Sequence, residues 1–406
     1  MQVQPLYRCV AALDVHLDLV VVCIIFAPSL EAEPECVMRE FGAFKRDRRA
    51  MAEWIASYKP DAVSMESTGI YWKSVYVALE RAGIRSSVVN AYHVSKVPGR
   101  KTDYSDAQWL AMLTRAGLLS SSFIPDESVR HLRLVSRYHS SLTGTLASTK
   151  NRLLKVLNDG GMRLTAKVSD AHGVASRAMI DAILKGRTPE QAVAHAGRLK
   201  ASREDLILAL DHELTPTHIY LAQTIQGEID HLQQQLGKLE EYLYGALARY
   251  EPLICLLLTI PGMDRPSIAK MLVEIGPNMQ AFATPDKLAV WCGVSPGNEQ
   301  SNKQRKKART QVANHHVRRV LVEVAQAAVK TKCYFKEKFD AWRIRLGYRK
   351  SVVAVAHKII KIVHIMLTRN VPYQDKSADF QALLVSRNHS RWMKALKKHG
   401  HLPETA

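Results

Sequence analysis

Residues 7–26 read YRCVAALDVHLDLVVVCIIF, and this stretch decides the fold of the first part of the chain. Two runs rich in β-branched and apolar side chains, residues 7–14 and 19–26, flank a short polar break, which is typical of two neighbouring strands. A third such run follows at residues 36–44. We therefore expect the chain to begin with a meander of three antiparallel strands.

Beyond this meander the pattern alternates between helix and strand. Helical periodicity over residues 48–58 leads to a strand at 61–65, and a helix over 71–82 leads to a strand at 84–90. A further helix is expected over residues 103–115. Three strands followed by alternating helices and strands predict an α/β layer architecture with a mixed sheet, in the strand order of an RNase H-like fold.

Length and charge limit the class of protein. The 406 residues include 57 Lys and Arg against 38 Asp and Glu, a net charge of +19. At about 150 residues per domain this length predicts two or three domains. The basic excess favours a polyanionic partner, nucleic acid or an anionic membrane surface, over a small neutral metabolite as the only ligand.

Cysteine usage and hydropathy indicate the compartment. The six cysteines form no C-x-x-C pair, which is typical of reduced thiols in an intracellular protein. The apolar run at residues 351–367 is interrupted by His and Lys, so we expect an amphipathic helix there and no membrane partner. The sequence therefore predicts a cytoplasmic protein.

The middle of the chain is helical. A helical pattern over residues 127–158 stops at Asn-Asp-Gly-Gly, residues 158–161. Later, apolar residues recur at alternating spacings of three and four, which predicts a short coiled coil or helical hairpin, a core helix of one bundle being equally compatible. These residues are Ala222, Ile225, Ile229, Leu232, Leu236, Leu239 and Leu243.

The last third of the chain contains a second helical signal. Residues 258–272, LTIPGMDRPSIAKML, place a Pro-Gly turn between two helices, which is the pattern of a helix-hairpin-helix with a phosphate site at Gly262. A plain αα-hairpin fits the same residues equally well. We predict domains over 1–125, 126–250 and 251–370, followed by a basic tail over 371–406.

Four carboxylates are candidate metal ligands. Asp14 ends the first strand, Glu66 ends the strand at 61–65, and Asp103 and Asp106 are three residues apart, which places both on one helix face. Converging acids repel one another unless divalent cations lie between them, and oxygen ligands suit Mg²⁺ or Mn²⁺. Two such ions can hold the attacking and leaving oxygens of a phosphodiester. Each acid alone also fits an ordinary cap or solvated side chain.

A serine with a basic surround forms the second candidate site. Residues 291–302, WCGVSPGNEQSN, precede a run of five basic residues in seven, and no acid occurs between Glu299 and Glu323. Such a stretch binds phosphates and could stabilise charge on a serine alkoxide or a transferring phosphoryl group. Charge alone favours the simpler interpretation, a solvated basic loop with an ordinary serine. The candidate nucleic-acid contacts are Lys303, Arg305, Lys306, Lys307, Arg309, Arg318 and Arg319.

Taken in order, the motifs resemble the RuvC-like DEDD transposases of the insertion-sequence one-ten family, whose relatives include pilin-gene invertases. The matching stretches are LDVH at 13–16, MESTG at 65–69, KTDYSDA at 101–107, SDAHG at 169–173, IPG at 260–262, and GVSP at 293–296 through QS at 300–301. They cover nearly the whole chain. In one departure, Asn302 follows the serine where the family usually has Gly.

The resemblance implies an RNase H-like (RuvC-like) N-terminal domain, a helical coiled-coil connector and a mostly α C-terminal transposase domain. It implies Asp14, Glu66, Asp103 and Asp106 as the acidic tetrad and Ser301 as the nucleophile. Donor and target DNA would be recombined under the guidance of a structured non-coding bridge RNA. A dimer pairing to a tetramer would act in the bacterial cytoplasm, associated with the nucleoid.

Other functions stay open at this point. In a RuvC-like junction nuclease, water would cleave the DNA and Ser301 would only contact phosphate, and a DNA invertase would share the same sites. In a non-catalytic nucleic-acid-binding protein the four acids would have no function, since they oppose binding to phosphates. An actin-like sugar kinase needs a Gly-rich phosphate turn after the first strand, and residues 14–18, DVHLD, contain no glycine.

Overall fold

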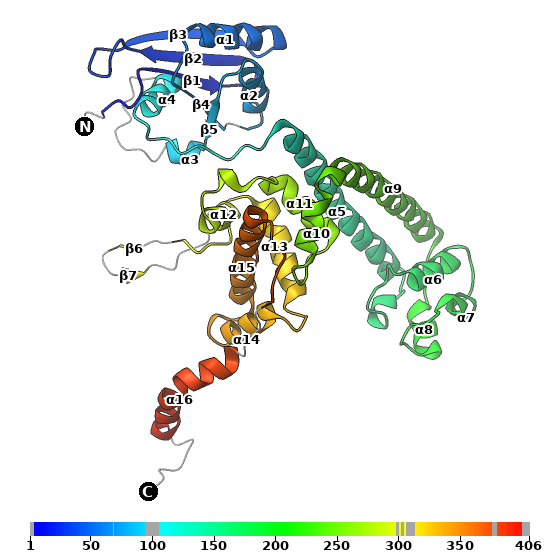
Figure 1. Cartoon of the computed structure of the whole chain (residues 1–406). Coiled ribbons are helices and arrows are strands. Elements are labelled where there is room, and N and C mark those ends of the chain that lie inside the picture. Colours follow the sequence, from blue (N-terminus) through cyan, green and yellow to red (C-terminus); the bar gives the residue numbers. More distant parts are fainter. Residues whose placement is uncertain are drawn as a thin grey trace. The chain divides into compact units, whose positions relative to one another are not determined.

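The computed structural model describes residues 4–67, 69–94, 105–297, 300–301, 304–305, 313–375 and 380–399 (Figure 1). The chain divides into two units, Met1–Ile124 and Pro125–Ala406. The four segments given above, 1–125, 126–250, 251–370 and 371–406, stay predictions.

The first unit is built on a five-stranded mixed sheet in the order β3-β2-β1-β4-β5. β1 (Cys9–Val15), β2 (Leu19–Phe26) and β3 (Glu35–Gly42) pair antiparallel, as the meander predicts. β4 (Ala62–Glu66) runs parallel to β1, and β5 (Ser86–Val89) runs parallel to β4. The mixed sheet predicted from the sequence is confirmed.

Helices cover both faces of this sheet because strands β1 and β2 are apolar on both sides. On one face, Leu13 and Met65 pack with α1 (Lys45–Ser57) and α2 (Trp72–Arg81). On the other face, Val10 and Ala12 pack with α4 (Asp106–Arg115) and with the short helix α3 (Ala91–Val94). Side chains therefore alternate along β1 between two separate cores.

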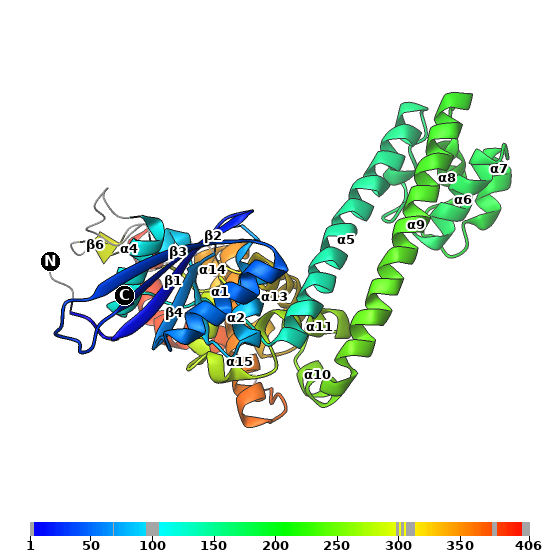
Figure 2. The same ribbon diagram turned by 90° about the horizontal axis from the view of Figure 1, so that it is seen from above.

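The second unit contains a long helical hairpin. α5 (Glu127–Asp159) and α9 (Pro216–Leu247) lie side by side (Figure 2). Their contacts fix an antiparallel register: His139 bonds Glu240 at 2.9 Å and Thr149 bonds Glu228 at 3.1 Å, while the Asp159 carboxylate lies 3.0 Å from His218. Each helix is about 50 Å long at 1.5 Å per residue.

The predicted heptad seam lies in this hairpin. Ala222, Ile225, Ile229, Leu232 and Leu243 are buried, and α5 of the same chain packs on α9. The seam therefore lies in a helical hairpin within one chain, which is one of the three structures compatible with the heptad pattern. Self-association through these side chains is not needed to bury them.

A small helical cap joins the two hairpin helices at one end. Its elements are η1 (Leu164–Ala166), α6 (Val174–Leu184), α7 (Pro189–Ala192), η2 (Val193–His195) and α8 (Arg203–Leu210). Met179, Ile183 and Leu206 pack there against Leu157 of α5 and Ile225 of α9. The cap therefore shares one core with the tip of the hairpin.

The remaining helices form a compact bundle followed by a C-terminal helix. They are η3 (Ala248–Tyr250), α10 (Glu251–Leu258), α11 (Arg265–Ile275), η4 (Met279–Ala281), α12 (Pro285–Trp291), α13 (His315–Ala328), α14 (Tyr334–Leu346), α15 (Tyr348–Arg369) and α16 (Phe380–Lys398). α15 is long and apolar enough to cross a membrane, but it packs against α12, α13 and α14. It is the central helix of the bundle.

A Pro-Gly turn at residues 261–262 connects α10 to α11, and its packing shows why a glycine stands at 262. The finer identification of this segment as a helix-hairpin-helix stays a prediction. Gly262 has φ +83°, and a Cβ atom there would lie 2.8 Å from the Val324 carbonyl oxygen and against the Ala328 backbone of α13. Asp264 caps α11 by accepting a 2.9 Å hydrogen bond from the Ser267 N–H. In the structure, Gly262 is a packing residue, and its role in binding phosphate stays a prediction.

Candidate active site

Asp14 and Glu66 lie on neighbouring strands of the sheet. β1 and β4 are parallel, the last paired residues are Leu13 and Met65, and each acid is the next residue along its strand. Leu13 and Met65 face the α1–α2 core, so the alternation of side chains turns both acids toward the opposite, α4-covered face. Both acids are half-buried. The two carboxylates therefore share one face at one end of the sheet.

Asp106 is the first residue of α4, and the direction of this helix decides where it lies. The Arg115 carbonyl at the end of α4 accepts hydrogen bonds from the Leu6 and Tyr7 N–H groups just before β1. Ten helical residues span about 15 Å, close to the length of β1. α4 therefore runs back along β1 and begins toward the strand end that carries Asp14.

The start of α4 is fixed by its cap. The Ser105 hydroxyl accepts a hydrogen bond from the Gln108 N–H at 3.3 Å, and the Gln108 side chain accepts one in return from the Ser105 N–H at 3.1 Å. This capping box satisfies N–H groups that the first turn leaves without helical partners. It positions Asp106 on a rigid element. Asp103, the fourth predicted ligand, lies outside the described residues.

A histidine that the motif analysis did not select contacts the first acid. His16 Nε2 lies 3.1 Å from Asp14 Oδ2, and its side chain is 53% exposed while that of Asp14 is 22% exposed. The imidazole thus covers one carboxylate oxygen from the solvent side. His16 is the residue after the end of β1, two positions beyond Asp14.

The donor chemistry of this face suits a divalent cation. Carboxylate oxygens are the ligands that Mg²⁺ and Mn²⁺ prefer, and Asp14 and Glu66 present two of them from a rigid sheet. Within the described part of the chain, no three His, Cys, Asp or Glu side chains lie close enough to hold a metal ion. The residues therefore fit a cation in type and placement, as two neighbouring donors.

The second candidate site lies in the segment 292–313, which we call the serine loop. Ser301 belongs to the two-residue strand β6 (Gln300–Ser301), which pairs antiparallel with β7 (Gln304–Arg305). In this pairing Gln300 is opposite Arg305 and Ser301 is opposite Gln304. The predicted contacts Lys303, Lys306, Lys307 and Arg309, and Asn302 after the serine, lie outside the described residues.

Both ends of the serine loop are fixed to the helical bundle. The two residues that flank the loop are joined by a hydrogen bond: the Asn314 N–H donates to the Trp291 carbonyl at 3.2 Å. Near the start of the loop, the Ser295 hydroxyl lies 3.4 Å from His357 Nδ1 of α15, and Asp286 lies 3.9 Å from the other ring nitrogen. Burial, together with Lys361, lowers the pKa of His357. The neutral imidazole is therefore favoured beside Ser295.

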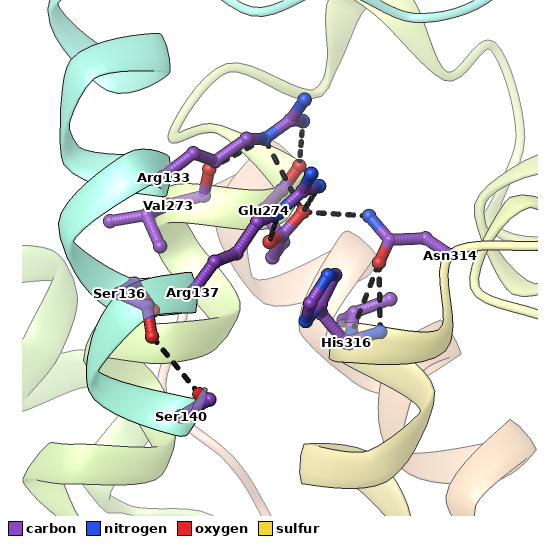
Figure 3. A network of polar contacts seen from close by, with 9 residues as sticks. Arg133, Ser136, Arg137, Ser140, Val273, Glu274, Asn314 and His316 are labelled. Atoms are coloured by element: carbon purple, nitrogen blue, oxygen red, sulfur yellow. Dashed lines mark hydrogen bonds and ion pairs between the residues drawn. The ribbon is translucent and has the colours of Figure 1, made fainter. Parts of the chain in front are cut away.

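A buried carboxylate lies beneath the end of this loop (Figure 3). Glu274 of α11 is 2% exposed and receives hydrogen bonds from Arg137 Nε at 2.8 Å and Nη2 at 2.9 Å. Arg133 Nε lies 3.3 Å from Glu274 Oε2, and Asn314 Nδ2 donates to the same oxygen at 2.7 Å. We call Arg133, Arg137, Glu274 and Asn314 the Glu274 cluster.

The two arginines of this cluster stabilise the charged form of Glu274. Burial tends to raise the pKa of Glu274, but the Arg137 hydrogen bond, the charges of Arg133 and Arg137, and Asn314 outweigh it, so the pKa is lowered overall. Burial lowers the pKa of Arg133 to about 10, which leaves it charged at neutral pH. Sequence reasoning missed this cluster, although an acid within the apolar helix 268–275 was a visible signal.

The remaining predicted nucleic-acid contacts lie on α13. Arg319 is 61% exposed and forms an i,i+4 pair with Glu323 at 3.1 Å, while Arg318 is half-buried. An exposed pair of this kind contributes little to stability and leaves the guanidinium accessible to a phosphate. Both arginines follow the serine loop on a rigid helix.

Two family models match the chain. A DEDD-type transposase model named for IS110 matches residues 11–160, and the model of the transposase IS116/IS110/IS902 family matches residues 255–340. Among solved structures, a Thermus thermophilus RuvC structure is 14% identical; the likeness covers 28% of this chain and 100% of that chain, with a TM-score of 0.22. Comparison with curated proteins gives no match. The first matched stretch contains the four candidate acids, and the second contains the serine loop.

Proposed function

Since this chain belongs to the IS110 family of DEDD transposases, we propose that it cuts and rejoins DNA as the recombinase of an insertion sequence. We propose that a metal-dependent acidic centre and a serine carry the reaction. The observation that supports the acidic centre best is the placement of Asp14 and Glu66 on parallel neighbouring strands, facing the same side of the sheet.

Asp14, Glu66, Asp103 and Asp106 would hold the cation, with Mg²⁺ or Mn²⁺ as the metal. A divalent ion bound there would polarise the scissile phosphodiester and stabilise charge on the reacting oxygens. The chain's own residues position the ligands. The sheet fixes Asp14 and Glu66, the capping box fixes the start of α4, and His16 holds one oxygen of Asp14 at 3.1 Å.

We assign the nucleophile to Ser301. Its oxygen would attack the DNA phosphorus and form a serine–phosphate ester, while the bond from phosphorus to the deoxyribose oxygen breaks and that oxygen leaves as a hydroxyl. Rejoining reverses these bonds with the hydroxyl of a new strand, so the energy of the phosphodiester is kept and no ATP is needed. The basic residues 303–309 would stabilise the charge that develops on phosphate.

The partners follow from charge and from the family. A net charge of +19 supports donor DNA, target DNA and a structured bridge RNA as ligands. A dimer that pairs to a tetramer would let the acidic centre of one subunit meet the serine of another. We place this assembly in the bacterial cytoplasm, on the nucleoid.

Substitution of the acids tests the proposal. Asp14→Asn removes a ligand charge without changing side-chain size, so DNA cleavage with Mg²⁺ should fall to background while DNA binding persists. Asp18→Asn is the matched control, because Asp18 is an exposed acid on the turn between β1 and β2. Cleavage by Asp14→Asn at the wild-type rate would contradict the acidic centre.

Three other functions remain as outcomes. A RuvC-like junction nuclease would release hydrolysed ends and would keep its activity in Ser301→Ala, since water would be the nucleophile. A DNA invertase would share both sites and differ only in the geometry of the joined products. A non-catalytic binding protein would cleave nothing in the wild-type form, with or without Mg²⁺.

A further inference from the structure

We propose that Glu274 is a positioning residue that sets the geometry of the serine loop, an inference that rests on the proposed function of Ser301. Glu274 lies on α11, outside the loop. It reaches the loop through Asn314, the residue that follows the segment 292–313 and begins α13.

Asn314 performs two tasks with one side chain. Its Oδ1 accepts hydrogen bonds from the His316 and Val317 N–H groups at 3.1 and 3.3 Å, which caps α13. Its Nδ2 donates to Glu274 at 2.7 Å. The cap therefore cannot rotate or shift without breaking the bond to Glu274.

The cluster also controls the other end of the loop. The Asn314 N–H bonds the Trp291 carbonyl at 3.2 Å, and the Arg133 guanidinium lies 5.9 Å from the centre of the Trp291 ring. Arg133 is itself held by the Val273 carbonyl at 3.0 Å and by Glu274. Glu274 is therefore linked through Asn314 to Trp291, so the residues just before and just after the serine loop are held together.

Stability alone does not explain a carboxylate here. Burying an ion pair costs desolvation that apolar side chains of the same size would avoid, so buried pairs contribute specificity more readily than stability. Glu274 is 2% exposed, accepts hydrogen bonds from Arg137 and Asn314, and forms an ion pair with Arg133. Such a cluster is satisfied in only one arrangement of α5, α11 and α13. We infer that this single arrangement holds the serine in register for attack.

The test separates the cap from the link to Glu274. Asn314→Ser keeps a good helix cap, since serine is as favourable as asparagine at this position, but its side chain is too short to reach Glu274. Asn278→Ser is the matched control: Asn278 caps η4 by accepting from the Gln280 N–H at 2.9 Å and has no bond to the cluster. Both variants leave the Arg137–Glu274 contacts in place, so both should fold.

The readout is the rate of covalent protein–DNA adduct formation on a nicked duplex at saturating DNA with Mg²⁺, beside the dissociation constant for the same DNA. We expect Asn314→Ser to slow adduct formation by about 10- to 100-fold, the cost of misplacing a reacting group. Its DNA affinity and melting temperature should match those of Asn278→Ser. A purely structural role for Asn314 would instead lower the melting temperature and leave the adduct rate per folded molecule unchanged.

A double substitution tests Glu274 itself. Glu274→Gln removes the charge and weakens the hydrogen bond from Asn314. Combined with Asn314→Ser it should slow the adduct rate no further than the slower single variant, because both changes act on the same link. Additive slowing would overturn the link, as would an unchanged rate in Asn314→Ser. Failure of the wild-type protein to form any adduct would refute the serine mechanism instead, so the two failures are distinguishable.

Discussion

Gly262→Ala is expected to destabilise the second unit severely, and the structure allows the cost to be divided. The residue has φ +83°, a left-handed conformation that costs an L-residue about 1–2 kcal/mol. The added Cβ would also lie 2.8 Å from the Val324 carbonyl oxygen and against backbone atoms of Ala328. Overpacking of this kind costs about 1–3 kcal/mol, so the total is about 2–5 kcal/mol.

Variants of two other glycines allow the conformational strain and the overpacking to be measured separately. Gly347 has φ +75° and open space where a Cβ atom would lie, so Gly347→Ala should cost only the conformational strain, about 1–3 kcal/mol. Gly227 lies in α9 with open space and no positive φ, so Gly227→Ala should stabilise the protein by about 0.5–1 kcal/mol.

Thermal unfolding followed by calorimetry measures all three variants. For a unit of this size, about 1 kcal/mol shifts the melting temperature by at least about 2 °C, so Gly262→Ala should melt about 4–10 °C lower than wild type. The order of melting temperatures should be Gly227→Ala, wild type, Gly347→Ala, Gly262→Ala. A Gly262→Ala protein that melts like wild type and loses only DNA affinity would refute the packing role and favour the phosphate site.

Three further predictions concern the metal, the buried cluster and the helical hairpin. Mg²⁺ should raise the melting temperature of the wild-type protein more than that of Asp14→Asn; equal increases in a thermal-shift series would argue against a shared cation site. The folded-state pKa of Glu274 is lowered, so its contribution to stability is present above its unfolded pKa and lost as pH falls through the folded value. In acid titrations of melting temperature, Glu274→Gln should therefore lose less stability than wild type, and parallel curves would contradict the ion pair. Leu232 is 8% exposed in the α5–α9 hairpin, so Leu232→Ala should lower the free energy of unfolding by about 2–5 kcal/mol. Normal stability together with a changed oligomer in light scattering would instead place this seam between chains.

The fold of the first unit could be predicted because its signals are local. Apolar runs such as residues 19–26 match β2 at both ends, and a strand buried on both faces leaves a continuous run that needs no knowledge of its partners. The ends of other strands differ by a few residues. The run predicted at 7–14 forms β1 at Cys9–Val15, because its pairing with β2 and β4 sets the limits of the strand.

The site could be predicted only in part. The proximity of Asp14 and Glu66 could be predicted because each ends a strand. Residues at the carboxyl ends of neighbouring parallel strands lie close together. The seam at 222–243 was visible as a heptad, but whether its partner is α5 or another chain depends on a contact about 80 residues away, between Thr149 and Glu228. Periodicity contains no information about that choice.

The Glu274 cluster could not be predicted because its members share no local pattern. Arg133 and Arg137 are ordinary charged residues at an i,i+4 spacing, and Asn314 reads as a simple helix cap. Only the packing of α5 and α13 on α11 brings them within 3.3 Å of one buried carboxylate. A single acid in the apolar run before Gly276 was the one hint.

Peptide mapping of the covalent adduct tests the central claim most directly. A nicked duplex is incubated with the wild-type protein and Mg²⁺, the adduct is trapped by denaturation, and the nucleotide-bearing peptide is identified by mass spectrometry. The account predicts a phosphodiester remnant on Ser301, formed by wild type and Ser295→Ala and missing in Ser301→Ala. A remnant on Ser295, whose hydroxyl lies 3.4 Å from His357, or the release of hydrolysed ends alone would contradict it.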